Sequence, residues 1–210
     1  MKGELNNIYI PSQDEFFRGV EEFIRYEKRD SMYKVATFLI SHFWGKSTDM
    51  ADGLGVLLLT WNQAFYRFGI FDFDKLEICI SKNLLILENF RKRNISSLSR
   101  SDEDDIEYLF NEFLLALQIH SGKSKGRRSP VAVAKALHLL APNFFPIWDH
   151  RIAKAYRCYY DKYPAEQYIL FCKIMKVIAV KIKGYIASTE KSILKLIDEY
   201  NYSKYTKVWI

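Results

Sequence analysis

Residues 129–149 read SPVAVAKALHLLAPNFFPIWD, and this stretch carries the clearest local signals of the fold. Ser129 and Pro130 are typical of a helix start, because serine caps free backbone N–H groups and proline fits the first turn. The alanine- and leucine-rich run that follows predicts a short apolar helix over residues 131–140. A proline-containing segment ends this helix, and Asp149 is then placed to cap another one. The stretch is therefore predicted to hold two successive helix starts.

The sequence on both sides of this stretch shows the same helical signals. Ser12 and Glu15 form a capping-box pattern, in which each side chain can satisfy a free N–H group at the start of a helix. Apolar residues then recur every three or four positions in most segments, which is the period of an amphipathic helix. We expect further helices from Ser12 onward and over residues 32–44, 47–68 (capped by Ser47 or Asp49), 72–90 (capped by Asp72 or Asp74), 102–119, 149–159, 164–187 and 190–200.

These patterns predict an all-α protein in which residues 1–210 form a single globular multi-helix domain. No segment alternates strongly enough between apolar and polar residues to predict a sheet, and only residues 205–210 are expected to be extended. The composition agrees, since 49% of the residues are hydrophobic and 27% are charged, as in globular proteins. Residues 92–101 are polar and serine-rich, so they are the best candidate boundary for two helical lobes with a cleft between them.

The chain is basic, with a formal net charge of +6, which favours a polyanionic partner such as duplex DNA. A basic surface without a specific partner is the alternative. The cations cluster best in residues 121–128, a glycine-containing segment predicted to be a flexible loop that tracks phosphates; the alternative is a loop that stays solvated and mobile. The residues predicted to contact nucleic acid are Lys123, Lys125, Arg127, Arg128, Ser129 and Arg151.

The cysteines and histidines give no sign of a metal site or a disulfide. Cys79, Cys158 and Cys172 are odd in number, form no CxxC motif and fall in predicted helices, and the four histidines show no ligand spacing with them. We therefore expect buried thiols in a reducing cytoplasm, with neither metal nor cofactor. The N-terminal residues contain no long apolar run and no segment reaches the length of a membrane span, so neither a signal peptide nor a membrane location is expected.

Lys135 and Asp149 are the candidate catalytic residues. Lys135 lies in the middle of the predicted apolar helix, and a lysine in a partly apolar pocket loses its proton more readily and can act as a nucleophile. Asp149 lies at a helix start, where a carboxylate is favoured and can stabilise a cation or orient water. A lysine and an aspartate that share a cleft can perform imine chemistry at a sugar C1′. The alternatives are that Lys135 faces solvent and that Asp149 only caps its helix.

Residues 127–157 read RRSPVAVAKALHLLAPNFFPIWDHRIAKAYR and resemble the core of the helix-hairpin-helix DNA glycosylase superfamily. That core carries a lysine on its second helix in the bifunctional members, then a hydrophobic loop, then an aspartate that opens the next helix. The downstream part, PIWDHRI at residues 146–152, is similar to the family pattern P-hydrophobic-x-D-x-H/R-hydrophobic. The resemblance implies an all-helical fold and DNA-repair activity, with Lys135 as the Schiff-base nucleophile and Asp149 as the catalytic carboxylate.

The resemblance departs from the family pattern at the hairpin. The family usually carries G-x-G just before the lysine, so that backbone amides can approach a phosphate. This chain has Val131 and Val133 at the matching positions. We expect the basic loop at residues 121–128 and the helix start at Ser129 to replace the missing phosphate contact.

A second group of residues forms a candidate base pocket. Trp61, Asn62 and Tyr66 lie on the predicted helix over residues 47–68, where Asn62 and Tyr66 are one turn apart. Aromatic and amide side chains can stack on a flipped base and hydrogen-bond to it. His138 and Trp148, which are close to Lys135 and Asp149 in sequence, complete the predicted pocket. Core packing of Trp61 and a satisfied core or surface position for His138 are the alternatives.

Three functions are consistent with these observations. The lysine–aspartate pair predicts a DNA glycosylase, with or without AP-lyase activity, that acts on a flipped damaged base. The missing glycine hairpin favours a non-catalytic nucleic-acid-binding protein on the same fold, or a helical interaction module without a nucleic-acid partner. The deciding observation is whether Lys135 and Asp149 open into one basic cleft.

Overall fold

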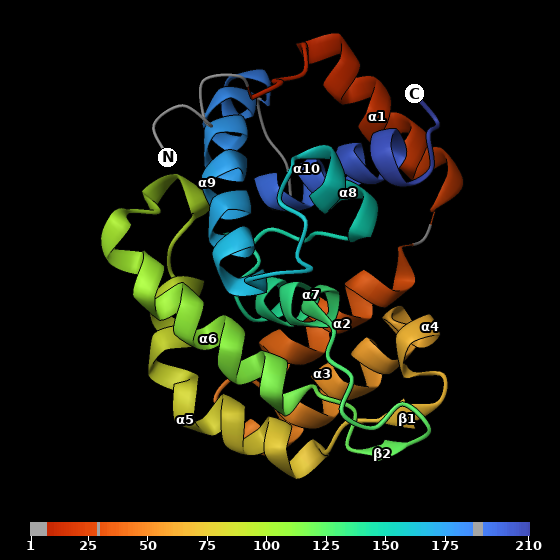
Figure 1. Ribbon diagram of the computed structural model, residues 1–210. Helices are drawn as coiled ribbons and strands as arrows, with labels where there is room; N and C mark the ends of the chain where they lie inside the picture. The colour runs from red at the N-terminus through yellow and green to blue at the C-terminus, as the bar shows by residue number, and fades with distance from the viewer. Residues whose placement is uncertain (1–7, 29, 187–190) are drawn as a thin grey trace.

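Figure 1 shows the computed structural model, which describes residues 8–28, 30–186 and 191–210. Helices dominate these residues, so the prediction of a single all-α domain is confirmed. None of the helices described is both long enough and apolar enough to cross a membrane. The helices are α1 (Gln13–Tyr26), α2 (Ser31–His42), α3 (Ser47–Trp61), α4 (Gln63–Tyr66), α5 (Phe73–Arg91), α6 (Glu103–Ala116), α7 (Pro130–Leu140), α8 (His150–Ala155), α9 (Pro164–Ile182) and α10 (Ile193–Asn201).

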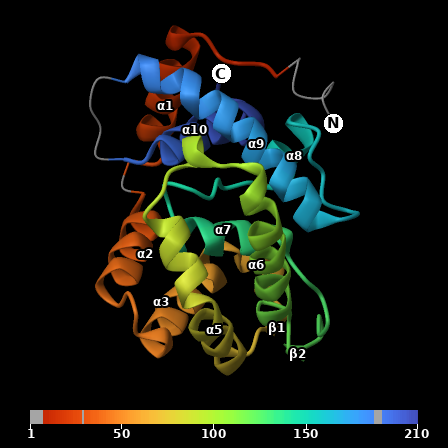
Figure 2. The same ribbon diagram turned by 90° about the vertical axis from the view of Figure 1, so that its left-hand side faces the viewer.

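The helices gather at two ends of the molecule, with α7 between them. In both Figure 1 and Figure 2, α1, α8, α9 and α10 lie at one end and α2, α3 and α5 at the other. Helix α1 packs against α10 although they come from opposite ends of the chain, and α7 contacts α2, α3 and α6. Every residue from Ala132 to Leu140 is buried, because α7 is surrounded in this way. The apolar sequence of α7 therefore forms the centre of the core.

Several helices begin where their capping residues predict. In each of these, a side-chain oxygen accepts a hydrogen bond from a backbone N–H two or three residues later, which satisfies a donor that the helix leaves free. Helix α3 was predicted to be capped by Ser47 or Asp49. Instead it begins at Ser47, and Lys46 at the cap position makes no side-chain cap bond. The confirmed caps are Ser12, Asp72, Ser129 and Asp149.

The helix predicted over residues 47–68 is broken in the structure. Helix α3 ends at Trp61, Asn62 leaves the helical conformation, and the short α4 follows. The carbonyl of Asn62 accepts backbone hydrogen bonds from Phe65 and Tyr66, so the chain restarts in a new turn. Asparagine is a weak helix former, and here its side chain bonds to a lysine of another helix. The predicted one-turn spacing of Asn62 and Tyr66 on a continuous helix is therefore wrong.

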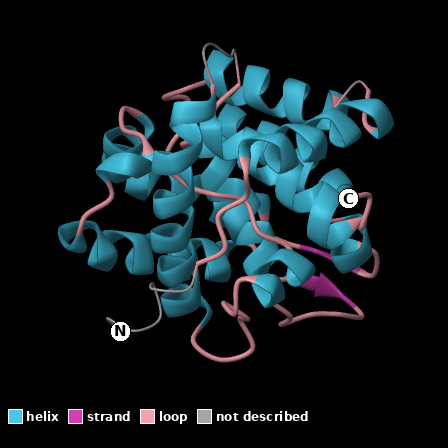
Figure 3. Cartoon of the chain, turned by 90° about the horizontal axis from the view of Figure 1, so that it is seen from above, coloured by secondary structure: helices cyan, strands magenta, loops and turns pink. Residues whose placement is uncertain are grey.

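The basic segment predicted to be a flexible loop forms an ordered turn. Its strand β2 (Ser121–Gly122) pairs antiparallel with β1 (Gly69–Ile70), and Figure 3 shows this small magenta pair at the side of the helices. Gly126 N donates to Ile119 O at 2.8 Å, which closes the turn. Gly122 has a φ of +92°, and a Cβ there would lie 2.3 Å from Phe68 O, so only glycine fits.

The segment over residues 92–101 forms the short 3₁₀ helix η2 (Ile95–Ser97) and begins a second one, η3 (Arg100–Asp102). Ile95 and Leu98 are buried, and η2 packs against α9. The segment is therefore partly anchored in the core by its two apolar residues. The lobe boundary proposed for it stays a prediction.

Several predicted helices end earlier than expected. Helix α6 stops at Ala116, α8 at Ala155 and α9 at Ile182, because the apolar period extends into segments that leave the helical path. The last helix begins at Ile193, whereas its predicted start at Glu190 lies outside the described residues. The predicted extended tail is corrected at its first two residues, since Tyr205 and Thr206 belong to the π-helix η5 (Tyr202–Thr206) that continues α10.

Candidate active site

A cavity of about 500 Å³ lies where α1, α2, α7, α8 and α10 meet. Its walls come from the N-terminal, central and C-terminal parts of the chain, which the fold brings together (Figure 1). Both predicted catalytic residues line it. The lining residues are Phe23, Tyr26, Glu27, Lys28, Asp30, Ser31, Met32, Trp61, Lys135, Ile147, Asp149, Ile152, Lys195, Asp198 and Tyr202.

Lys135 is buried on α7, with only 9% of its surface exposed. Its Nζ donates to Trp61 O at 3.0 Å and to Asn62 Oδ1 at 2.7 Å, at the C-terminal end of α3. The Nζ also lies 4.7 Å from the centre of the Trp61 ring, where a cation is attracted by the π electrons. The alternative that Lys135 faces solvent is therefore wrong, because α7 is covered on all sides.

The surroundings of Lys135 lower the pKa of its ammonium to about 8. Burial is the main cause, since removing a charge from water favours the neutral amine. The carboxylates of Asp198 and Asp149 act in the opposite direction and offset part of the effect. At pH 7 about a tenth of the side chains is then neutral, which follows from one pH unit below the pKa. The cavity therefore holds an amine that is partly deprotonated near neutral pH.

Asp149 is both a helix cap and a lining residue of the cavity. Its Oδ1 accepts from Ile152 N at 2.7 Å, in the first turn of α8. Its Oδ2 accepts from the hydroxyl of Thr206 in η5. The cap interpretation is confirmed, and it does not exclude the catalytic one, because the carboxylate also faces the cavity that contains Lys135. Two donors fix its orientation there.

A cluster of buried charges forms the α10 side of this cavity. Lys195 Nζ lies 3.0 Å from Asp30 Oδ2, 3.5 Å from Asp198 Oδ2 and 3.7 Å from Glu199 Oε1. Burial would lower the pKa of Lys195, but the three carboxylates outweigh it and raise that pKa. Burial also raises the pKa of Asp198 to about 6, although Lys195 partly opposes it. Sequence reasoning missed this cluster.

The sequence contained one signal for the cluster. Lys195, Asp198 and Glu199 are spaced by three and four residues, so they lie on one face of a helix. Such a pattern normally indicates an exposed ion pair, and nothing local in the sequence shows that it is buried.

The cavity is shared by Lys135 and Asp149, but it is not the basic cleft that the nucleic-acid hypothesis required. Acidic side chains balance the lysines, so the cavity alone gives no strong attraction for phosphate. Its charged lining residues are Glu27, Lys28, Asp30, Lys135, Asp149, Lys195 and Asp198.

A second cavity of about 540 Å³ adjoins the first one, because Trp61 and Asp149 line both. Asn62 also lines it, so two residues of the predicted base pocket lie beside the predicted catalytic residues. Phe65 and Tyr160 add aromatic surface to its wall. The Asn62 amide has a defined orientation, since Lys135 can only donate and therefore contacts the amide oxygen.

The other three predicted base-pocket residues lie in the core. Tyr66, His138 and Trp148 line neither of the two cavities at Lys135 and Asp149. The Tyr66 hydroxyl donates to Leu117 O at 3.0 Å, and Trp148 Nε1 donates to Pro130 O at 3.2 Å. The predicted base-pocket position of these three residues is therefore corrected, because their polar atoms are hydrogen-bonded inside the protein.

His138 has the satisfied core position that was the alternative. It is fully buried, with Nε2 3.0 Å from the Tyr33 hydroxyl and Nδ1 2.7 Å from Phe145 O. Burial lowers the pKa of His138 to about 3, so the imidazole is neutral at physiological pH. It supports α7 from inside the core and does not contact the cavity.

The basic turn lies next to the second cavity. Lys123, Lys125, Arg127 and Arg128 are exposed, and the Arg127 guanidinium lies 5.5 Å from the ring centre of Phe65, which lines that cavity. Ser129 was predicted to contact nucleic acid at this helix start. In the structure it is buried, and its hydroxyl accepts the cap hydrogen bond of α7. Arg151 binds the carbonyl of Thr206.

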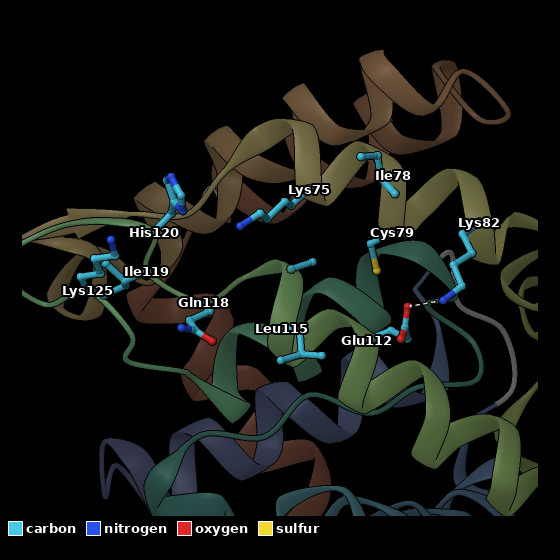
Figure 4. A pocket seen from close by; sticks show the side chains of 11 residues that line it. Lys75, Ile78, Cys79, Lys82, Glu112, Leu115, Gln118, Ile119, His120 and Lys125 are labelled. Atoms are coloured by element: carbon cyan, nitrogen blue, oxygen red, sulfur yellow. Dashed lines mark hydrogen bonds and ion pairs between the residues drawn. The ribbon is translucent and has the colours of Figure 1, made fainter.

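A third cavity of about 610 Å³ lies between α5 and α6 (Figure 4), and Lys135 does not line it. Lys75, His120 and Lys125 lie toward one end, and Lys82 and Glu112 pair at 3.0 Å toward the other. Of the predicted site residues, only Lys125 lines it. This cavity therefore contributes nothing to the lysine–aspartate site.

Comparisons with protein-family models, curated proteins and solved structures found no match to this chain. The site must therefore be interpreted from its own geometry.

Proposed function

We propose that this chain cleaves N-glycosidic bonds in duplex DNA, with Lys135 as the nucleophile and Asp149 as the carboxylate that stabilises positive charge on the sugar. The observation that carries the proposal is that both residues line one cavity. The lowered pKa of Lys135, to about 8, supports a nucleophilic amine. The resemblance of residues 127–157 to helix-hairpin-helix DNA glycosylases supports the same roles.

The chemical step uses one new bond and one broken bond at C1′. The Lys135 nitrogen donates its lone pair to C1′ while the bond from C1′ to the base breaks, and the base leaves with that electron pair and gains a proton. The lysine nitrogen then loses a proton, O4′ leaves C1′ and is protonated, and a protonated C1′=N imine remains. Asp149 stabilises the positive charge that develops on the sugar as the base departs.

The hydrogen bonds of Lys135 are compatible with this step. A neutral amine keeps two N–H groups and one lone pair. Trp61 O and Asn62 Oδ1 can accept from the two N–H groups, so the lone pair stays available for C1′. These two contacts hold the nitrogen in place without consuming its reactive electrons.

Recognition of the DNA backbone is assigned to the basic turn. The cavity itself has nearly balanced charges, whereas the turn has four exposed cations beside the second cavity. Clustered cations bind phosphates through release of counterions, and they would hold the strand while one nucleotide enters the cavities.

Borohydride trapping tests the proposal directly. We expect the wild-type protein to form a covalent adduct with duplexes that contain an abasic site or an oxidised base, and the adduct to map to Lys135. Lys135→Gln should reduce the adduct to background, because an amide cannot form the imine, while its NH₂ group can still donate to Trp61 O or Asn62 Oδ1. Lys75→Gln, at an exposed lysine of the third cavity, should trap normally.

Three results would overturn parts of the proposal. An adduct that maps to Lys28 or Lys195 would remove Lys135 from its role. No adduct would eliminate the lyase activity, and no base release from a panel of damaged duplexes would then eliminate the glycosylase as well.

Asp149→Asn should slow base release and keep the helix cap, since asparagine also caps well. A non-catalytic DNA-binding protein would be the remaining function if only binding is observed.

The basic turn makes a separate prediction for DNA affinity. Replacing Lys123, Lys125, Arg127 and Arg128 with serine should reduce the slope of log affinity against log salt by about 0.9 for each phosphate that the protein no longer neutralises. Fluorescence anisotropy of a labelled duplex between about 50 and 200 mM salt measures this slope. The control variant carries serine at four exposed lysines elsewhere, and an equal effect there would show that only net charge matters. Its positions are Lys34, Lys46, Lys162 and Lys181.

A further inference from the structure

Asp198 also lines the cavity that holds Lys135 and Asp149. Asp198 comes from α10, so it reaches the cavity from a different element than Lys135 on α7 or Asp149 before α8. It is close enough to both residues to interact with their charges. Asp198 therefore shares the cavity with Lys135 and Asp149, although the proposed function gives it no role.

The two carboxyl groups have different surroundings. Asp149 accepts hydrogen bonds from a backbone N–H and from the hydroxyl of Thr206, and both contacts favour an acceptor. Asp198 is buried with its Oδ2 3.5 Å from the Nζ of Lys195, and that ammonium lies closer to Asp30, at 3.0 Å. Carboxyl groups whose environments differ in this way commonly divide the acid and base roles of a site.

The charged groups around Asp198 come from several elements. Glu199 and Lys195 lie on its own helix, and burial raises the pKa of Asp198 to about 6 although Lys195 partly opposes the change. The groups that face it from other elements are Asp30 before α2, Tyr33 on α2, Lys135 on α7 and Asp149 before α8, while Glu27 and Lys28 line the same cavity.

We propose that Asp198 is the general acid of the reaction, and that it gives its proton to the departing base; this inference rests on the proposed function. As the bond from C1′ to the base breaks, the base takes the electron pair of that bond and the proton of the Asp198 carboxyl group. The resulting carboxylate lies beside the ammonium of Lys195, which stabilises it. Water supplies the next proton before another turnover.

The assignment gives a specific dependence of base release on pH. The reaction needs Asp198 protonated and Lys135 neutral, with pKa values of about 6 and about 8. Between pH 6 and pH 8 the protonated fraction of Asp198 falls as the pH rises, while the neutral fraction of Lys135 increases. The two changes cancel in the rate of base release. We expect base release by the wild-type protein to be nearly flat from pH 6 to 8 and to fall on either side.

An abasic duplex separates the two steps, because it contains no base to protonate. Its trapping needs the neutral amine and no proton for a departing base, so we expect it to rise with pH up to about 8. Asp198→Asn should slow base release by at least about 10²-fold and change its flat pH profile into a rising one. The same variant should trap the abasic duplex within a few-fold of wild type, and Asp198→Glu should restore part of the base release.

The outcomes are distinguishable. If wild-type base release rises between pH 6 and 8 like abasic trapping, no such acid takes part, and the inference fails while the proposed function stands. An equal loss of base release and abasic trapping in Asp198→Asn would assign Asp198 a purely structural role. If the wild-type protein neither traps nor releases any base, the proposed function itself fails, and the inference fails with it.

Discussion

Replacing Trp148 with alanine is expected to lower the free energy of unfolding by about 3–5 kcal/mol, the range for removal of a large buried aromatic side chain. Trp148 is fully buried, and its ring centre lies 5.1 Å from those of Tyr160 and Tyr168 and 5.6 Å from that of Phe171. Tyr160 lies between α8 and α9, whereas Tyr168 and Phe171 lie on α9. All three rings pack against Trp148, which precedes α8. Alanine would leave a cavity that the surrounding rings cannot fill.

Urea unfolding followed by circular dichroism at 222 nm measures this change. Leu85→Ala is the control, because this leucine is 86% exposed and its truncation should change stability by less than about 0.5 kcal/mol. A loss in Trp148→Ala no larger than that of the control would contradict the described packing. Trp148→Phe should lie between the two, since it keeps part of the ring and removes the hydrogen bond to Pro130 O.

Replacing Lys195 with methionine is expected to cost about 3–5 kcal/mol near neutral pH, because it removes the buried cation that Asp30, Asp198 and Glu199 share. Lys195 is 1% exposed and pairs with Asp30, Asp198 and Glu199. Methionine keeps much of the volume of the lysine side chain, so the loss comes mainly from charge. Lys92→Met is the control, since Lys92 pairs with Glu88 on the surface, where an ion pair contributes little.

The cost of Lys195→Met should shrink as the pH falls. The pKa of Asp198 is raised to about 6 by burial, compared with 3.8 for an ordinary aspartate. Between these values the folded protein binds more protons than the unfolded chain, so lower pH stabilises the fold. Without Lys195 the carboxyl groups should take up protons at still higher pH, which enlarges the effect. Chemical denaturation of Lys195→Met and of its control Lys92→Met at pH 5 and pH 8 measures this change in cost. If Lys195→Met costs the same free energy of unfolding at both pH values, charge is not the cause of the loss.

The helix starts could be predicted from the sequence because capping is a local interaction. Ser12, Ser129 and Asp149 each bond to a backbone N–H three residues later, so the signal and its partner lie within four residues. The all-α class followed from the same short-range signals and the helical period. Helix ends were less accurate, since the apolar period of the sequence continues beyond Ala116 and Ala155, where the structure leaves the helix.

The sequence raised the hypothesis that Lys135 and Asp149 share one cleft, and in the structure both residues line one cavity. The same structure removed Tyr66, His138 and Trp148 from the site, because their polar atoms bond to carbonyls or hydroxyls inside the core. An aromatic or histidine side chain near a candidate residue in sequence gives no information about the direction in which it packs.

The helical class, the capped starts and the apolar character of α7 could be predicted from residues that lie close together in the chain. The burial of Lys135 and the position of Asp198 in the same cavity could not, because they depend on how distant helices pack. The depth of a charged side chain depends on partners that are distant along the chain: Lys135 bonds to Trp61 O, 74 residues away, and Lys195 pairs with Asp30 from the start of α2. Local patterns specify hydrogen bonds within a helix turn, whereas burial and the resulting pKa of an amine arise from the packing of whole helices.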